Sequence, residues 1–490
     1  MSQRSTQCLH FTLLFSITFI SIMGLSYSFP SHAQSTALPD NIRGALCLVR
    51  ADEQIVLVNE KITGKFSLPG GGISPHEPAS AAAEREAWEE TGLVVTAKSV
   101  IGYTDTAVIF DCVSDSELVA YEFQNREGGY VLPIWFAPHY GVETNSAMLI
   151  DPNRVNASQY RYPEQWNAIR KIFAIASEQP ALYLEDLINA APVFHQREIE
   201  LIQKIQNSIS SLPEPLSNII GSIIITGDIF GQSWLILILF PLLFSCVKKQ
   251  AAIKVMFVFV CTSLLALVAR QGFSLPAPYA YFPELQRLPD VGLSFPNIAI
   301  TLWVSCSLVL MSSLKWLDWN KFSALIFTIG VWFGLSQLCA GVTYFSDIVV
   351  GAILGVLIAW HVERLERKPE IDLGKLLSSK GLWCGMALIC LILTMIWPQP
   401  IFTQWLGATV TIAVVFCLPG SSFSFEGRSL VPLVISIGLM TVSSFALNYL
   451  KMQLNYSSLY ILIVDMLRFP LMVSVWLFVY ISCLKGPKVR

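Results

Sequence analysis

Three glutamates, Glu86, Glu89 and Glu90, are spaced so that they could act together on one helix. Residues at i, i+3 and i+4 lie on the same face of an α-helix, so the three carboxylates would point in one direction. Carboxylates this close repel one another unless a cation joins them. Hard oxygen ligands select Mg²⁺ or Mn²⁺, and these ions also bind phosphate oxygens. The cluster therefore predicts metal-assisted attack of water on a diphosphate.

The segment around these glutamates also contains several glycines and a further glutamate, Glu77. An exposed acidic helix with ordinary i, i+4 pairing is the alternative interpretation, but it does not explain those residues. Residues 71–93 are GGISPHEPASAAAEREAWEETGL. This segment resembles the Nudix box, G-x(5)-E-x(7)-R-E-U-x-E-E-x-G-U, at every fixed position, with Ala87 a small choice at its apolar position. The resemblance implies an α/β/α sandwich and hydrolysis of a nucleoside diphosphate linked to another group.

The resemblance also assigns roles to individual residues. Glu86, Glu89 and Glu90 would bind Mg²⁺ or Mn²⁺ and, with Arg85, form the catalytic group. Arg85 can reach Glu89 one helical turn later and hold its orientation. The glycines before the helix allow a tight turn, and a free carbonyl there, taken as that of Gly70, can be another metal ligand.

Family members often take one more carboxylate from a later loop. Glu143, Glu122 and Glu127 are the candidates, and nothing in the sequence ranks them. His76 stands at a variable position of the box and is expected on the surface. The sequence does not indicate which residues bind the substrate.

The elements around this segment predict an α/β domain over residues 40–155. Gly44–Val58 has the pattern of two strands joined by a polar turn at Ala51–Gln54. Pro78–Thr91 is helical in pattern, with Gly92 where a C-terminal cap belongs. Further strands are expected over 93–100, 107–112, 118–123 and 130–136. From Pro163 to Ile209 the pattern becomes helical, which predicts a helical connector over residues 156–215.

The rest of the chain is strongly apolar. Hydrophobic residues make up 53% of the sequence and charged residues 14%, which predicts a protein with a large part in lipid. About nine stretches have the length of a membrane span, which predicts an all-α polytopic domain. These stretches are residues 234–247, 255–269, 294–314, 322–342, 348–360, 382–397, 402–418, 431–449 and 459–484.

The distribution of basic residues predicts the topology. If the first span begins outside the cytoplasm, the loops expected on the cytoplasmic side contain most of the lysines and arginines of the helical part. The outer loops contain few basic residues beyond Arg270, Arg287 and Lys451. Residues 1–33 resemble a secretory signal with a cut after Ala33, or else an uncleaved anchor. We expect a multi-pass protein of the bacterial inner membrane with an exported α/β domain. The sequence shows no basic surface for nucleic acid.

Two cysteines, Cys47 and Cys112, belong to the predicted soluble domain. Their spacing does not fit a metal site. A disulfide and a pair of buried free thiols are both compatible with the sequence.

Residues 216–365 resemble the type 2 phosphatidic acid phosphatase family, followed by additional helices over 366–490. Arg270 stands for the lysine of the first motif, but Ala277 replaces its arginine. Ser294-Phe-Pro-Asn297-Ile-Ala299 has the frame of the second motif without its serine, glycine or histidine. In the third, Thr343 replaces the nucleophilic histidine, while Ser336 and Asp347 remain. That family's mechanism needs histidines and basic residues at these places, so we predict an inactive domain that serves as an anchor or a lipid platform.

These observations predict a membrane-bound, metal-dependent Nudix pyrophosphohydrolase. Its substrate would be a small-molecule diphosphate, with nucleotide sugars, dinucleotides and polyprenyl diphosphates all containing the required bond. Two alternatives stay open: a non-catalytic sensor that binds lipid or nucleotide, and a lipid phosphatase with an atypical site. The intact glutamates oppose the first, and the missing histidines oppose the second.

Overall fold

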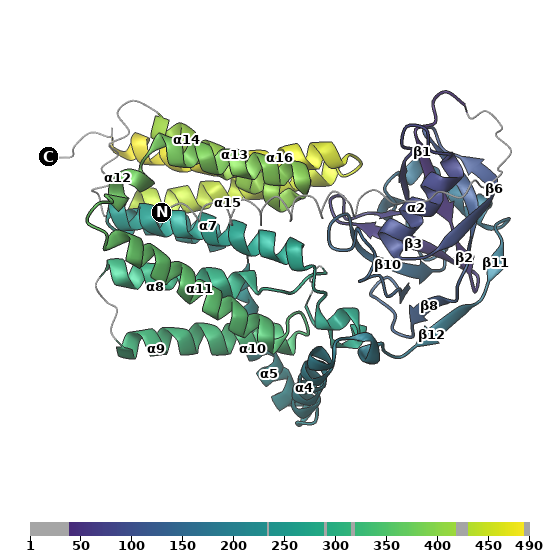
Figure 1. The fold of residues 1–490 in the computed structure, drawn as a ribbon, viewed down its shortest axis with the longest axis horizontal. Coiled ribbons are helices and arrows are strands. Elements are labelled where there is room, and N and C mark those ends of the chain that lie inside the picture. Colours follow the sequence, from purple (N-terminus) through teal and green to yellow (C-terminus); the bar gives the residue numbers. More distant parts are fainter. Residues whose placement is uncertain (1–38, 233–234, 289–291, 315–318, 418–429, 485–490) are drawn as a thin grey trace, which may run out of the picture. The chain divides into compact units, whose positions relative to one another are not determined.

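The computed structural model describes residues 39–232, 235–288, 292–314, 319–417 and 430–484. The predicted signal segment, residues 1–33, lies outside the described residues. The chain divides into two units, with the boundary between Ile42 and Arg43. Everything below concerns the second unit, in which strands form an N-terminal α/β domain and helices form a C-terminal domain (Figure 1).

The α/β domain is built on mixed sheets. One has the strand order β5-β1-β7-β6, in which β1 and β7 are parallel. A second has the order β11-β2-β3-β10-β9, with β4 paired to β3, and a third consists of the parallel strands β12 and β8. The strands are β1 (Gly44–Leu48), β2 (Arg50–Ala51), β3 (Gln54–Glu60), β4 (Phe66–Ser67), β5 (Gly70–Gly72), β6 (Val95–Tyr103), β7 (Ala107–Ser114), β8 (Leu118–Tyr121), β9 (Tyr130–Val131), β10 (Thr144–Ile150), β11 (Glu178–Gln179) and β12 (Ala181–Leu184).

The predicted pair of strands over Gly44–Val58 is present but divided between two sheets. Asp52 and Glu53 form the turn with positive φ angles of 45° and 58°, and they join β2 to β3. β1 lies instead beside β5 and β7. The chain therefore passes from one sheet to the other at Val49, which a pattern of apolar residues alone does not reveal.

Helix α2 (Ala79–Thr91) carries the glutamates and packs against β1, β5 and β6. Its buried face is formed by small residues such as Ala82, Ala83 and Ala87, so the helix can lie close to the sheet. Gly92 ends the helix at φ 70°, and its N–H donates to Trp88 O. The predicted C-terminal cap is thus present, because glycine adopts this left-handed conformation without a steric cost.

The predicted helical connector is wrong for part of its length. Helix α3 (Trp166–Phe173) buries Trp166 and Ile169 in the core of the α/β domain, against Leu48 and Ile55. The chain then forms β11 and β12, which pair with β2 and β8. Only α4 (Val193–Ser210) and α5 (Glu214–Ile225) lead on to the helical domain. The apolar face of α3 completes the domain core rather than linking two domains.

The strand expected over residues 130–136 is also shorter than predicted. β9 ends at Val131, and Pro133 follows where a central strand would need a backbone donor. Residues 132–143 form a loop, and β10, which the sequence pattern did not predict, pairs with β3 immediately after it. This loop contains His139 and Glu143.

A disulfide joins Cys47 of β1 to Cys112 of β7. The two strands are neighbours in the same sheet, and the Cα atoms are 5.6 Å apart, a usual spacing for a disulfide. Of the two states that the sequence allowed, the structure contains the disulfide.

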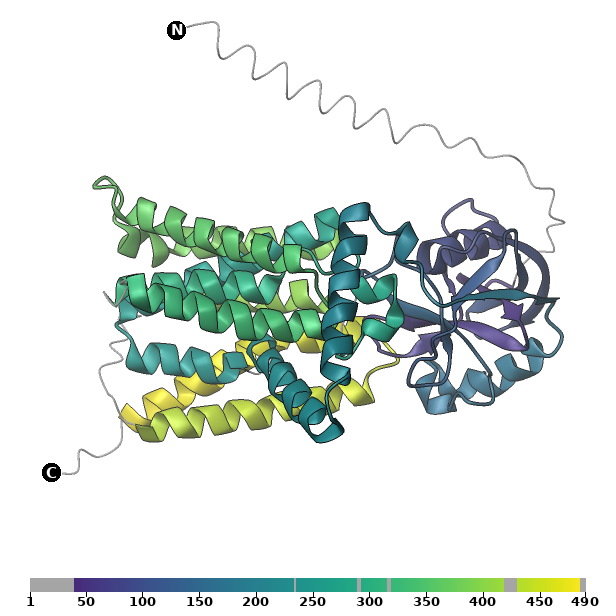
Figure 2. The same cartoon turned by 90° about the horizontal axis from the view of Figure 1, so that it is seen from below.

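The C-terminal domain is all helical, and its long helices lie side by side (Figures 1 and 2). Among the described residues, six helices are long and apolar enough to cross a membrane, and three shorter apolar helices accompany them. By length and composition these helices suggest a membrane protein. The helices are α6 (Leu235–Cys246), α7 (Lys249–Phe273), α8 (Ile298–Ser313), α9 (Trp319–Phe327), η7 (Thr328–Phe333), α10 (Gly334–Cys339), α11 (Phe345–Glu366), α12 (Leu373–Leu377), α13 (Lys380–Ile396), α14 (Pro400–Cys417), α15 (Leu430–Gln453) and α16 (Ser458–Leu484).

Within the described residues, each predicted apolar stretch coincides with one of these helices over most of its length, and α9, η7 and α10 together cover one of them. Helix α8 packs against α7 and α11, and α14 packs against α13 and α16. Asp465 of α16 is fully buried, and its carboxylate lies 2.7 Å from Lys451 Nζ and 3.5 Å from Arg468 Nη2. Asp465 therefore pairs with Arg468 on its own helix and, at the shorter distance, with Lys451 of α15.

Candidate active site

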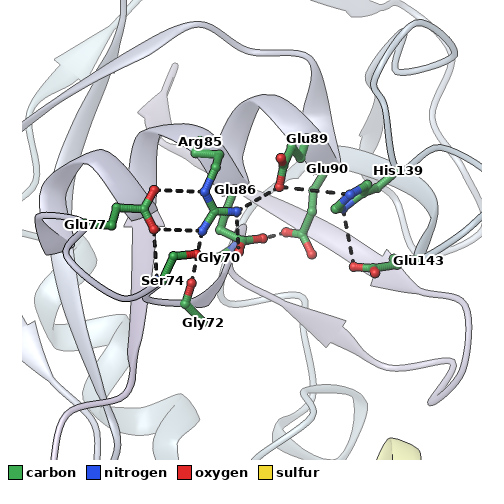
Figure 3. Close-up of polar contacts among 10 residues, drawn as sticks. All are labelled: Gly70, Gly72, Ser74, Glu77, Arg85, Glu86, Glu89, Glu90, His139 and Glu143. Atoms are coloured by element: carbon green, nitrogen blue, oxygen red, sulfur yellow. Dashed lines mark hydrogen bonds and ion pairs between the residues drawn. The ribbon is translucent and has the colours of Figure 1, made fainter. Parts of the chain in front are cut away.

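The carboxylates of α2 gather at the point where β5 approaches the helix (Figure 3). Glu86 and Glu90 are buried, with 9% and 8% of their surface exposed, and Glu89 is half-buried. Positions 86 and 90 are one turn apart and face the sheet, so their charges are largely removed from water. Such burial of like charges is unfavourable without a compensating cation.

Arg85 links the glutamates at this site. Its Nη1 donates to Glu86 Oε1 at 2.8 Å and to Glu89 Oε2 at 2.9 Å, the second being the contact expected from their spacing. Its Nε and Nη2 bind the two oxygens of Glu77, and Nη2 also donates to Gly72 O at 3.0 Å (Figure 3). The guanidinium lowers the pKa of Glu77. Arg85 therefore links the turn before the helix to the face of α2 that carries the glutamates.

Glu90 is fixed by the glycine strand. Gly70 N–H donates to Glu90 Oε2 at 3.0 Å. Burial raises the pKa of Glu90 well above its usual range, against the lowering effect of the Gly70 hydrogen bond. The charges of Glu86, Glu60 and Glu143 act in the same direction as burial. The carboxyl group therefore lies in a region of unbalanced negative charge.

Glu86 lies directly against Gly71. A Cβ atom at position 71 would come within 2.5 Å of the Glu86 carboxylate, so only glycine leaves this carboxylate its place. At Gly70 a Cβ would come within 2.5 Å of Ala45 O on β1. Burial raises the pKa of Glu86, while the Arg85 hydrogen bond opposes the shift.

The loop after β9 adds His139 and Glu143, which sequence analysis did not place together. His139 N–H donates to Glu89 O at 2.8 Å, which joins the loop to α2. His139 Nε2 lies 3.9 Å from Glu89 Oε2, and His139 Nδ1 lies 3.3 Å from Glu143 Oε2 (Figure 3). The contact with Glu143 raises the pKa of His139, and the same contact lowers the pKa of Glu143.

These contacts distinguish Glu143 from Glu122 and Glu127, the other two candidates for a later carboxylate. Glu143 belongs to the site through His139, and its charge acts on Glu90. Glu122 follows β8, and its N–H donates to Leu184 O, while the N–H of Glu127 donates to Asn125 Oδ1 in a turn. These hydrogen bonds join neither residue to α2. His139 was missed because a lone histidine in an irregular loop has no periodic signal. His76 is exposed, as expected.

The donor set fits a divalent cation. Ligand atoms of Glu86, Glu89 and His139 all lie within 4.8 Å of one another. Glu90 is held beside them by Gly70 and shares their electrostatic environment. Carboxylate oxygens suit Mg²⁺ and Mn²⁺, and an imidazole favours Mn²⁺ of these two. Of the metal ligands expected from the sequence, this group contains Glu86 and Glu89, and it adds the imidazole of His139.

The degenerate motif residues of the helical domain lie around one cavity. Arg270, Ser294, Asn297 and Thr343 all line it, although they come from separate elements. Thr343 Oγ1 donates to Asp347 Oδ2 at 3.3 Å. The segments that resemble the phosphatase motifs are therefore neighbours in space.

His195 of α4 also approaches this region, although it is far from the motifs in sequence. Its ring stacks on Tyr344 with a centroid distance of 4.1 Å and an angle of 12° between the planes. Tyr344 directly follows Thr343, but His195 is not among the described residues that line the cavity. No imidazole therefore replaces the missing histidine side chain on the cavity wall, as far as the described residues extend.

Comparison with known proteins concerns the α/β domain. The family model of the NUDIX domain matches residues 40–147, a range that contains α2, β5 and the loop with His139 and Glu143. This part of the chain is a Nudix hydrolase domain. The match ends before α3 and does not reach the helical domain.

Two solved structures are similar to parts of the chain. An ADP-ribose pyrophosphatase from Streptococcus suis is 19% identical, with a TM-score of 0.20, and the alignment covers 29% of this chain and 97% of that one. A MutT protein from Methanosarcina mazei is 26% identical, with a TM-score of 0.13, over 15% of this chain and 64% of that one. No curated protein sequence matches the chain.

Proposed function

We propose that this protein is a membrane-bound, Mg²⁺- or Mn²⁺-dependent pyrophosphohydrolase that cleaves a small-molecule diphosphate on the extracytoplasmic side of a bacterial inner membrane. One observation carries the proposal: Glu86, Glu89 and Glu90 converge beside Gly70 with more buried negative charge than Arg85 can balance. A structural helix has no need for this arrangement, whereas a metal site requires it.

The metal would be held by Glu86, Glu89 and Glu90, with the Gly70 carbonyl as a further ligand. A bound divalent cation supplies Lewis-acid stabilisation of the negative charge on the phosphate oxygens. Arg85 is a positioning residue, because its guanidinium fixes the carboxylates of Glu86 and Glu89 and has no free direction toward a substrate.

Glu143 and His139 are the proposed residues for proton transfer. Glu143 orients the imidazole through Nδ1, and Nε2 faces Glu89. Such a carboxylate–histidine pair can accept a proton from water, because the carboxylate stabilises the charged ring. An oriented imidazole of this kind also suits a metal ligand, so the pair contributes to the site in either role.

Two features support an extracytoplasmic Nudix domain. The Cys47–Cys112 disulfide suits an oxidising compartment. The chain enters the helical domain at the N-terminal end of α6. Basic residues such as Lys249, Arg367 and Lys380 lie at helix ends on the opposite side of the domain. Because positively charged loops stay in the cytoplasm, the α/β domain belongs on the other side.

The helical domain is proposed to be an anchor without phosphatase activity. Thr343 occupies the place of the nucleophilic histidine, and a threonine hydroxyl bound to Asp347 cannot form the phosphohistidine that the mechanism requires. The proximity of Arg270, Ser294 and Thr343 supports the resemblance to the phosphatase family in architecture. The lining of the cavity around these residues is compatible with binding of membrane lipid.

The proposal is tested with the purified full chain and three diphosphate classes: a nucleoside diphosphate sugar, a dinucleotide and a polyprenyl diphosphate. We expect hydrolysis of one class that depends on Mg²⁺ or Mn²⁺ and stops with a chelator. Glu90→Gln should lower kcat/KM by about 100-fold or more, since it removes a charged ligand. Asp347→Asn should leave this activity unchanged.

Glu117→Gln is the matched control, because it makes the same chemical change outside the site. Glu117 is exposed in the turn between β7 and β8. Phosphate release that needs no metal and survives Glu90→Gln would overturn the assignment. Loss of that release in Asp347→Asn would instead support the atypical phosphatase.

A further inference from the structure

The loop after β9, residues 132–143, contacts the helical domain as well as α2. Its partner is the segment between α7 and α8, described over residues 274–288 and 292–297 and hereafter named the α7–α8 segment. Tyr140 of the loop is 7% exposed, and its Oη donates to Gly292 O at 3.1 Å. The loop that approaches the glutamates is therefore also hydrogen-bonded to the helical domain.

Close backbone packing accompanies this hydrogen bond. Gly141 and Gly292 both have positive φ angles, 72° and 76°. A Cβ atom at position 292 would come within 3.3 Å of Gly141 Cα, and one at position 141 within 3.0 Å of Leu293 Cγ. Because neither glycine has a side chain, the two backbones can approach this closely. Earlier in the loop, the ring of Trp135 packs against Tyr281, with centroids 4.8 Å apart.

The acceptor that Tyr140 uses is fixed within the α7–α8 segment. Gly292 O also accepts from Ala277 N–H, at 2.9 Å. Gly292 N–H donates to Tyr279 Oη. Both polar groups of this buried residue are therefore held by the helical domain itself, so it offers a defined place for the loop.

A tight turn connects Tyr140 to the site. His139 O accepts from the N–H groups of the three residues that end the turn, Val142, Glu143 and Thr144, at 3.0, 3.0 and 3.2 Å. Hydrogen bonds that close a turn fix its residues relative to one another. A displacement of Tyr140 is therefore carried to His139 and Glu143, the two side chains that face the glutamates (Figure 3).

We propose that the helical domain takes part in the hydrolase site, because the α7–α8 segment holds His139 and Glu143 beside α2 through the contact between Tyr140 and Gly292. Tyr140 is a positioning residue: its hydroxyl bonds the helical domain, while its backbone belongs to the turn. The catalytic consequence rests on the proposed function, whereas the attachment of the loop to the helical domain does not.

Three tyrosine-to-phenylalanine variants of the full chain test the proposal. Tyr140→Phe removes the hydrogen bond from the loop, and Tyr279→Phe removes the acceptor of Gly292 N–H within the helical domain. Tyr121→Phe is the matched control. Tyr121 Oη donates to Ala280 O at 2.6 Å, so this variant loses an equivalent bond to the same segment, but from β8 rather than from the loop.

The first measurement is hydrogen–deuterium exchange of a peptide covering residues 132–144, followed by mass spectrometry. Exchange in this peptide should rise by about 5- to 10-fold in Tyr140→Phe, which is the equilibrium effect of one buried hydrogen bond. It should rise in Tyr279→Phe as well. In Tyr121→Phe the exchange of this peptide should equal that of the wild type.

The second measurement is the steady-state kinetics of diphosphate hydrolysis, with melting temperatures recorded in parallel. We expect kcat to fall by about 5- to 10-fold in Tyr140→Phe and by about threefold or more in Tyr279→Phe. KM should stay within about twofold of the wild type, because the displaced groups act in the chemical step. Tyr121→Phe should keep the wild-type kcat although it loses a bond to the same segment.

Wild-type exchange of the peptide in Tyr140→Phe would overturn the proposal, and so would an equal loss of kcat in Tyr140→Phe and Tyr121→Phe. Faster exchange with an unchanged kcat would also overturn it, because the attachment of the loop would then have no effect on the site. If the wild-type chain hydrolyses no diphosphate, the proposed function fails, and the exchange measurement alone decides whether the helical domain holds the loop.

Discussion

Replacement of Gly71 by alanine isolates the position of one carboxylate. The new Cβ would lie 2.5 Å from Glu86 Oε1, and ordinary contacts begin near 3.4 Å, so the carboxylate must retreat by about 0.9 Å. A displacement of about 1 Å in a catalytic group costs about 100-fold in rate. We therefore expect kcat to fall by about 100-fold and the Mg²⁺ concentration for half-maximal activity to rise.

Gly72→Ala is the matched control, because a Cβ at position 72 would meet nothing within 4 Å. Both variants are assayed as purified full chains over a Mg²⁺ titration, with melting temperatures measured in parallel. The melting temperature of Gly71→Ala should stay close to that of the wild type. If Gly71→Ala keeps its activity within about threefold of the wild type, or if both variants lose activity equally, the reasoning about Glu86 is refuted.

Three further changes test separate parts of the molecule. Arg85→Ala should lower kcat/KM by about 100-fold, since three glutamates lose their common donor; a loss below tenfold in the hydrolysis assay would contradict this. Glu143→Gln should lower kcat by about 10- to 100-fold and alter the pH profile of kcat, and an unchanged profile would exclude the proposed proton transfer. Replacement of Cys47 and Cys112 by serine removes a disulfide between positions 65 residues apart. The free energy of unfolding should therefore fall by about 4 kcal/mol. Equal denaturation midpoints for the wild type and this variant would contradict that expectation.

The helix of the candidate site was predictable because its signals are local. The spacing of Glu86, Glu89 and Glu90 depends only on helical periodicity, and Gly92 caps the helix through its own conformational freedom. The contact from Arg85 to Glu89 follows from the same periodicity. None of these features requires knowledge of the rest of the chain.

The errors in the predicted elements arose where distant segments pack together. The apolar face of α3 has the pattern of a helical linker, yet Trp166 and Ile169 fill the α/β core. The apolar run after Tyr130 resembles a strand, yet Pro133 and the turn into β10 end it at Val131. In both cases periodicity indicates which residues are buried, but not which partner buries them.

Local sequence was sufficient to predict the Nudix box, the apolar helices and the charge pattern of the segments between them, because each is encoded by residues close together in the chain. Only the tertiary structure brought His139 and Glu143 to the carboxylates, joined Cys47 to Cys112, and placed Tyr140 beside Gly292, 152 residues apart. The physical reason is that burial and hydrogen bonding select contacts by distance in space, and a linear pattern carries that distance only within a helix or a strand.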